Sequence, residues 1–95
     1  MSRFDQAKML MKVKKIQKEL ERQQISIEKG DGAVRVEING EQKIKKIHID
    51  PDAVNDIEQL ELWLEEAVKE AIATSQKVAA EKMQPMMGAL GDLGL

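Results

Sequence analysis

The chain has 95 residues, enough for one small domain, and its 42% hydrophobic and 34% charged residues are typical of a folded, soluble protein. It has no cysteine and a single histidine, which excludes disulfides, cysteine catalysis and multi-cysteine or multi-histidine metal sites within one chain. No apolar run approaches the ~20 residues needed to span a membrane, and the N-terminus has no apolar signal core. The sequence therefore predicts a cytoplasmic protein without a membrane partner.

The two halves of the chain carry opposite charge, which the net charge of −2 conceals. Residues 1–48 contain 12 basic and 7 acidic side chains, whereas residues 49–95 contain 3 basic and 10 acidic ones. This division is typical of a protein that turns one end toward a polyanion. It is also expected of two solvated helices of opposite sign that attract each other, so charge alone leaves both interpretations open.

Residues 3–24 are expected to form the first helix. Ser2, followed three positions later by Asp5, resembles a capping box. The apolar stripe has helical 4-3-4 spacing and consists of Met9, Val13, Ile16 and Leu20. Roughly the opposite face carries Lys8, Lys15, Lys18 and Arg22, flanked by Lys12 and Lys14. Phe4 and Met11 lie among these lysines, which suggests that this end of the helix meets a partner subunit.

Residues 25–49 change to the period of two that is typical of strands. Ile25 and Ile27 begin a short first strand, and residues 29–32 form a glycine-containing turn. Residues 34–38 are the clearest half-buried strand. Asn39-Gly40 predicts a type I′ hairpin turn. In the third strand, residues 42–49, Ile44 falls on the opposite face from Ile47 and Ile49, which indicates a bulge or an Ile44 that faces something other than its own core.

Asp50-Pro51 ends the third strand, and Asn55 with Glu58 is a capping-box candidate for a helix over residues 57–83. Its apolar stripe consists of Ile57, Leu60, Leu64, Ala67, Val68, Ala71, Ser75 and Val78. Leu62 lies opposite this stripe and Trp63 at its edge, so both are expected to be exposed in a lone subunit. Residues 84–95 are rich in Met, Gly and Leu and predict a flexible tail.

These elements predict an α+β fold of the order α-β-β-β-α, forming one domain over residues 1–83. We expect a three-stranded antiparallel meander flanked by two long helices that cover one face of the sheet. The other face and the edges of the sheet stay open, which favours a homodimer. Candidate interface residues are the apolar side chains left without a place in the core, namely Phe4, Met11, Ile44, Leu62 and Trp63.

No catalytic arrangement can be assembled from these residues. A nucleophilic triad needs a base, and the single imidazole, His48, is expected on an exposed strand. The acids near residue 50 do not form a calcium loop, because Val54 and Asn55 occupy the positions of a ligand and a glycine. The turn at residues 29–32 precedes no helix, so it is not a phosphate loop. The sequence predicts no enzyme, cofactor, metal or small-molecule substrate.

Two functional hypotheses follow from the surface. In the first, a homodimer binds duplex DNA through backbone phosphates, since no aromatic residues interleave the lysines as single-strand stacking would require. The candidate DNA contacts are Lys8, Lys12, Lys15, Lys18 and Arg22, with Lys45 and Lys46 from the third strand. In the second, the chain is a non-enzymatic protein-interaction module whose apolar tail and exposed helix faces dock on a partner.

Three segments favour the first hypothesis by resemblance. MLMKVKKIQKEL at residues 9–20, GAVRVEING at residues 32–40 and IHIDP at residues 47–51 resemble the YbaB/EbfC family of bacterial nucleoid-associated proteins. The resemblance extends over essentially the whole chain. It implies a small cytoplasmic homodimer of tweezer-like shape whose projecting helices grip DNA in the nucleoid. It further implies a protein that changes DNA conformation, organises the nucleoid and affects gene expression.

Overall fold

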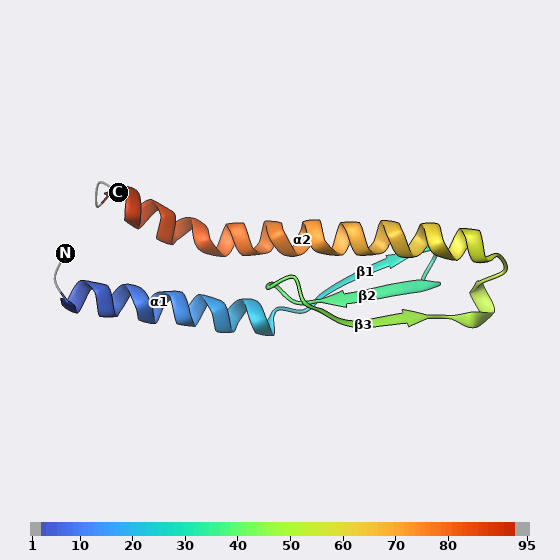
Figure 1. Cartoon of the computed structure of the whole chain (residues 1–95), viewed down its shortest axis with the longest axis horizontal. Helices are drawn as coiled ribbons and strands as arrows, with labels where there is room; N and C mark the ends of the chain where they lie inside the picture. The colour runs from blue at the N-terminus through green and yellow to red at the C-terminus, as the bar shows by residue number, and fades with distance from the viewer. Residues whose placement is uncertain (1–2, 93–95) are drawn as a thin grey trace.

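The computed structural model describes residues 3–92, with side chains as far as residue 86. The molecule is elongated, 62 × 20 × 15 Å (Figure 1). Its elements follow the expected α-β-β-β-α order and are α1 (Arg3–Arg22), β1 (Ile25–Lys29), β2 (Val34–Ile38), β3 (Ile44–Ile49), the short 3-10 helix η1 (Pro51–Ala53) and α2 (Ile57–Asp92). The predicted α+β fold class is therefore confirmed.

The three strands form an antiparallel meander in the order β1-β2-β3. The turn between β1 and β2 has positive φ angles at Gly30, Asp31 and Gly32, of 66°, 55° and 90°. Two glycines in this turn remove the steric cost of the left-handed conformation at their positions. The predicted glycine turn is thus confirmed, and Asp31 between the two glycines also has a positive φ.

The connection between β2 and β3 is not the predicted type I′ turn. It has five residues, 39–43, and its positive φ of 61° falls on Gln42. The backbone N–H of Gly40 instead donates to the carbonyl of Leu20 at the end of α1, at 2.7 Å. A Cβ on Gly40 would lie 2.8 Å from the Leu20 side chain and 2.9 Å from its carbonyl oxygen. Glycine is needed here for close approach to a helix and not for a positive φ.

The predicted bulge in β3 is confirmed. Glu37 pairs with Lys46 and the next residue, Ile38, pairs with Ile44, so Lys45 is an extra residue without a cross-strand partner. An extra residue reverses the alternation of side chains along the strand. The bulge therefore returns Ile44 to the face that Ile47 and Ile49 occupy, the face that α2 packs against.

The core lies between α2 and the first two strands only. Val34, Val36 and Ile38 of β2 are buried against Ala67 and Ala71 of α2, whose small side chains let the helix approach the sheet closely. Within residues 3–92, α2 contacts β1 and β2 but makes no comparable contact with β3. As a result the core-facing isoleucines of β3 stay exposed, by 42% for Ile44, 45% for Ile47 and 37% for Ile49.

The expectation that both helices cover the sheet is wrong, because α1 makes no set of contacts with the strands in the described part of the chain. It projects beyond the sheet and runs antiparallel beside the second half of α2 (Figure 1). The predicted apolar stripe of α1 packs toward α2, with Leu20 buried and Val13 and Ile16 half-buried. Glu19 and Lys82 add an ion pair of 3.6 Å between the two helices.

The predicted start of α2 at Ile57 is confirmed, but its cap and its end differ from the expectation. Asp56, not Asn55, caps the helix, since its Oδ1 accepts from the backbone N–H of Glu58 at 3.1 Å. The helix continues through Pro85 to Asp92 instead of ending at residue 83, and its last turns bend away from its axis (Figure 1). Met86, which the sequence pattern places in the tail, is only 7% exposed. Residues 93–95 of that tail lie outside the described residues.

Candidate nucleic-acid interface

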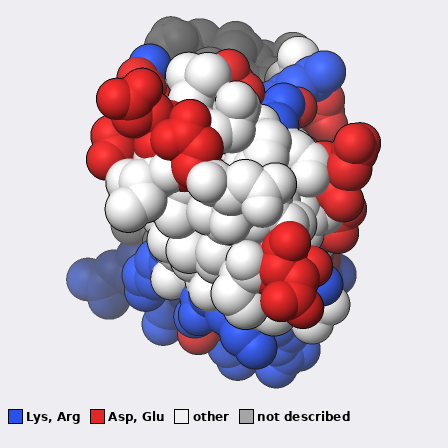
Figure 2. All heavy atoms as spheres, turned by 90° about the vertical axis from the view of Figure 1, so that its right-hand side faces the viewer, with Lys and Arg blue, Asp and Glu red and all other residues white. Residues whose placement is uncertain are grey.

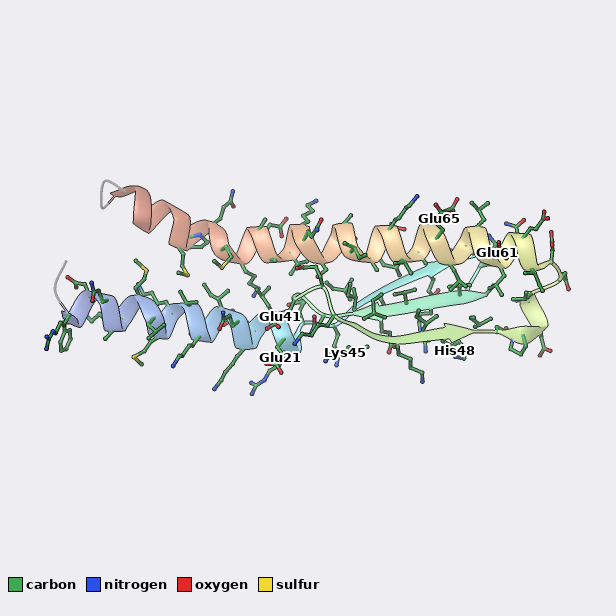
Figure 3. The ribbon with its side chains drawn as sticks, in the orientation of Figure 1. Glu21, Glu41, Lys45, His48, Glu61 and Glu65 are labelled. Atoms are coloured by element: carbon green, nitrogen blue, oxygen red, sulfur yellow. The ribbon has the colours of Figure 1, made fainter. Side chains whose placement is uncertain are left out.

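Helix α1 presents its basic side chains away from the rest of the molecule. It contains seven basic and three acidic residues, whereas α2 contains three basic and seven acidic ones. Because the apolar stripe of α1 is turned toward α2, the remaining faces of α1 lie in solvent. Figure 3 shows long side chains ending in nitrogen that project from the side of α1 away from α2. The exposed candidates on this helix are Lys8, Lys12, Lys15, Lys18 and Arg22.

The two lysines predicted as contacts on β3 lie in different surroundings. Lys45, the bulge residue, lines a groove of about 610 Å³ at the junction of α1 and the sheet, together with Arg22 from the last turn of α1 and the acidic residues Glu21 and Glu37. Figure 3 shows Lys45 beside the end of α1. Lys46 lies on the open face of the sheet, directly across from Glu37. The structure therefore brings Lys45, but not Lys46, together with the basic residues of α1.

The candidate contacts are electrostatically available. The ion pairs within the described residues use other basic side chains, namely Lys29, Arg35, Lys43, Lys69 and Lys82. The ammonium group of Lys8 lies 5.5 Å from the centre of the Phe4 ring, a cation–π contact that leaves its charge in solvent. A polyanion can thus meet these cations without first breaking an internal ion pair.

The acidic surface lies on the other side of the molecule. In the end-on view of Figure 2, acidic side chains gather over the upper part, which α2 forms, and lysine and arginine gather along the lower edge. On α2, a hydrogen bond from Lys69 at 2.7 Å lowers the pKa of the Glu65 carboxyl. Glu70 of α2 similarly raises the pKa of Lys29 through a contact of 2.6 Å. The charge division seen in the sequence is therefore a division between two sides of the fold.

The open face of the sheet is polar. Cross-strand neighbours on this face form two rows, Ser26–Glu37–Lys46 and Glu28–Arg35–His48, which bring opposite charges side by side. This face therefore has no net excess of positive charge to attract DNA. Among residues 3–92 no group of three or more His, Cys, Asp or Glu side chains could hold a metal ion. No helix in the same range is long and apolar enough to cross a membrane.

The five predicted dimer-interface residues do not form one surface. Phe4 and Met11, 74% and 71% exposed, belong to the projecting helix α1, whereas Leu62, 48% exposed, lies near the start of α2 at the other end of the molecule. Trp63 is half-buried against the core of its own chain and packs on Gly30. Of the five, Ile44 alone belongs to a continuous apolar strip.

That strip consists of Ile44, Ile47 and Ile49 on β3, and the last two are absent from the interface predicted from the sequence. Their alternation correctly places them on the core-facing side of the sheet. The sequence does not directly indicate how many strands α2 covers. The one indication that β3 stays uncovered is the kind of residue in the apolar stripe of α2. A helix stripe built largely from small residues packs closely over a narrow part of the sheet, which leaves an edge strand uncovered.

The structure is thus an elongated α+β fold of the order α-β-β-β-α, with one basic helix projecting from a body in which acidic side chains predominate. The model of the YbaB/EbfC DNA-binding family matches residues 2–90, and the chain belongs to this family. It is 34% identical over 90 residues to a nucleoid-associated protein of Clostridium novyi, covering 93% of this chain and 79% of the relative. It is likewise 34% identical over 87 residues to a nucleoid-associated protein of Chloroflexus aurantiacus, covering 90% and 87%.

A solved structure has the same fold. The crystal structure of an uncharacterised protein from Helicobacter pylori superposes with a TM-score of 0.79, at 17% identity, over 85% of this chain and 87% of that one. The family resemblance predicted from the sequence over essentially the whole chain is confirmed by the family model and by the two nucleoid-associated relatives.

Proposed function

We propose that this chain is a nucleoid-associated protein that binds duplex DNA as a homodimer, in the cytoplasm, with low sequence specificity. In this role it changes DNA conformation and thereby affects nucleoid organisation and gene expression. The observation that carries the proposal is the exposed basic surface of α1, continued by Lys45 in the groove that it shares with Arg22. The chain belongs to a DNA-binding family, which supports DNA as the polyanion that this surface binds.

Low specificity follows from the kind of side chain on this surface. Lysines on a single exposed helix face reach phosphates, which position a protein on DNA but carry no sequence information. Each neutralised phosphate releases condensed counterions, so binding is expected to weaken steeply with salt. The acidic side formed by α2 repels the DNA backbone and so orients the molecule with α1 toward the duplex.

A homodimer is supported by the uncovered strip on β3. Three isoleucines exposed by 37–45% lie on the core-facing side of an edge strand that pairs only with β2. A second copy can cover this strip and remove the free edge, in a two-fold arrangement that presents the same patch twice.

The proposal is tested by titrating random-sequence duplex DNA at several salt concentrations while the mass of the protein in solution is recorded. We compare K15Q/K18Q, on α1, with K69Q/K77Q, on α2. Both variants remove two positive charges from exposed helical positions. The first is expected to weaken binding to all sequences and to lower the salt slope by about 0.9 for each phosphate that is no longer neutralised. The second is expected to bind like the wild type.

Two results would overturn the DNA-binding role. A protein that ignores duplex DNA even at low salt has no DNA-binding function of this kind. Equal weakening in the two double variants would show that net charge alone, and not the surface of α1, attracts the DNA. A mass of one chain at the concentrations where DNA is bound would contradict the homodimer.

A further inference from the structure

The loop between β2 and β3 makes hydrogen bonds to both helices, and so links the sheet to α1 and to α2. Asn39 is 1% exposed and Ser75, in the middle of α2, is fully buried. The Ser75 hydroxyl donates to the carbonyl of Asn39 at 2.6 Å and accepts from the backbone N–H of Gln42 at 3.1 Å. The side-chain amide of Gln42 also donates to the same hydroxyl, at 3.1 Å. One buried hydroxyl therefore fastens this loop to α2.

The same loop is fastened to the end of α1. The N–H of Gly40 donates to the Leu20 carbonyl at 2.7 Å, and the Asn39 side-chain Nδ2 donates to the Glu21 carbonyl at 3.3 Å. These two carbonyls belong to the last turn of α1, where a helix runs out of regular N–H partners. The Leu20 carbonyl also accepts from the N–H of Gln23, at 3.2 Å, so the loop adds donors to the end of the helix. We call Asn39, Gly40 and Ser75 the clasp.

Asn39 performs two separable tasks within the clasp. Its Oδ1 accepts from the backbone N–H groups of Glu41 and Lys43, at 2.9 and 3.1 Å, which shapes the loop itself. Its Nδ2 donates outward to α1. A carboxylate in place of the amide keeps the acceptor and removes the donor. The link to α1 can therefore be removed while the hydrogen bonds within the loop remain.

Outside the clasp, α1 is held only along one side. It makes no set of contacts with the strands within residues 3–92, and its packing against α2 is supplemented by the Glu19–Lys82 ion pair between partly exposed side chains. Exposed ion pairs of this kind contribute little to holding two elements together. Residues 23–24 join the last turn of α1 to β1, and the clasp adds the hydrogen bonds that tie this turn to the loop before β3.

We propose that Asn39, Gly40 and Ser75 are positioning residues that hold the end of α1 beside the start of β3, so that the cations Arg22 and Lys45 line one groove, whose other charged residues are Glu21 and Glu37. This role in DNA binding rests on the proposed function, whereas the positioning itself does not. The clasp contacts no DNA in this proposal. It acts through the geometry of the two basic elements that it joins.

The experiment measures the placement of α1 directly. Because the chain has no cysteine, spin labels can be attached at K14C on α1 and K77C on α2, both exposed positions. Labelled chains are diluted with unlabelled protein so that each assembly contains one labelled copy, and the distance distribution between the labels is recorded by pulsed electron resonance. N39D is compared with N55D, which makes the same chemical change at an exposed position. S75A is compared with S26A, another exposed site.

We expect N39D and S75A to shift or broaden the distance distribution, while N55D and S26A keep that of the wild type. DNA affinity is compared in S75A and S26A, which add no charge to the groove, and is expected to fall in S75A only. Far-UV circular dichroism identifies any variant that fails to fold. If S75A fails to fold, the distances in N39D, which keeps the hydrogen bonds within the loop, decide whether the clasp positions α1. Unchanged distances in both clasp variants would overturn the proposal. If the wild type itself binds no DNA, the proposed function fails, and the distances still decide whether the clasp positions α1.

Discussion

The indole ring of Trp63 packs directly on Gly30, so that a Cβ on this glycine would lie 2.7 Å from two ring carbons. Gly30 has a φ of +66°, in the turn between β1 and β2, and Trp63 lies in the second turn of α2. One glycine therefore satisfies two requirements at once, a left-handed backbone and space for a ring. The contact fixes the start of α2 over the end of the first hairpin and withdraws Trp63 from the surface.

Replacing Gly30 with alanine is expected to destabilise the protein by about 3 kcal/mol, because a strained φ and an overpacked contact add together. Gly32 is the matched control, since its φ is +90° but no atom lies within 4 Å of an added Cβ. G32A should cost about 1 kcal/mol, from backbone strain alone. Chemical unfolding measures both values, and the emission of Trp63, the only tryptophan, should change in G30A alone. Equal destabilisation by the two variants would show that the ring contact contributes nothing.

The bulge predicts that two adjacent lysines differ in their contribution to DNA binding. Lys45 shares a groove with Arg22, whereas Lys46 is not among the residues that line this groove, although its cross-strand neighbour Glu37 is. K45A is expected to weaken DNA binding and to reduce the salt slope by about 0.9 per protomer. K46A should change both quantities less. A titration at three salt concentrations distinguishes the two variants, and a larger effect of K46A would place the DNA on the open face of the sheet instead.

The strip on β3 predicts which apolar residue is needed for self-association. I47E puts a charge in the centre of the proposed interface and is expected to raise the dimer dissociation constant by about 100-fold, because a buried unpaired carboxylate is strongly disfavoured. M11E makes the same kind of change at a more exposed residue, on α1. Sedimentation equilibrium measures the constant for both variants. If M11E dissociates the dimer and I47E does not, the interface lies on α1 and not on β3.

The Glu65–Lys69 pair predicts a small decrease of stability in acid. Lys69 lowers the pKa of the Glu65 carboxyl below its ordinary value of 4.5. A lowered pKa contributes stability above the unfolded value, and the contribution disappears as the pH falls through the folded pKa. Wild type should therefore be more stable than E65Q at pH 7, and the difference should shrink as the pH falls below 4.5 and through the lowered pKa of Glu65. E61Q, at another exposed glutamate of α2, is the control, and the same pH dependence in E61Q would assign the effect to general charge repulsion.

The local structure of this chain follows directly from its sequence. Alternating Val34, Val36 and Ile38 predict a half-buried strand, and the misplaced Ile44 predicts the bulge, because both signals depend only on the period of nearby residues. Three segments of the sequence are sufficient to predict the family. The basic character of the first helix is equally apparent, since opposite faces of a helix are determined by spacing alone.

How these elements meet depends on the packing of the whole chain. The sequence predicts an apolar stripe on α1 but does not indicate whether the sheet or α2 receives it, because both surfaces are apolar. From the sequence, Gly40 is interpreted as part of a turn and Ser75 as part of a stripe of small residues. The hydrogen bonds of the clasp join positions 18 to 36 residues apart, which no local pattern indicates. The helical pattern places Trp63 at the edge of the apolar stripe and therefore at the surface. It does not indicate the contact with Gly30, because these two residues are far apart in the chain. Periodicity reports which side of an element is apolar, whereas contacts between distant segments form only when the chain has folded as a unit.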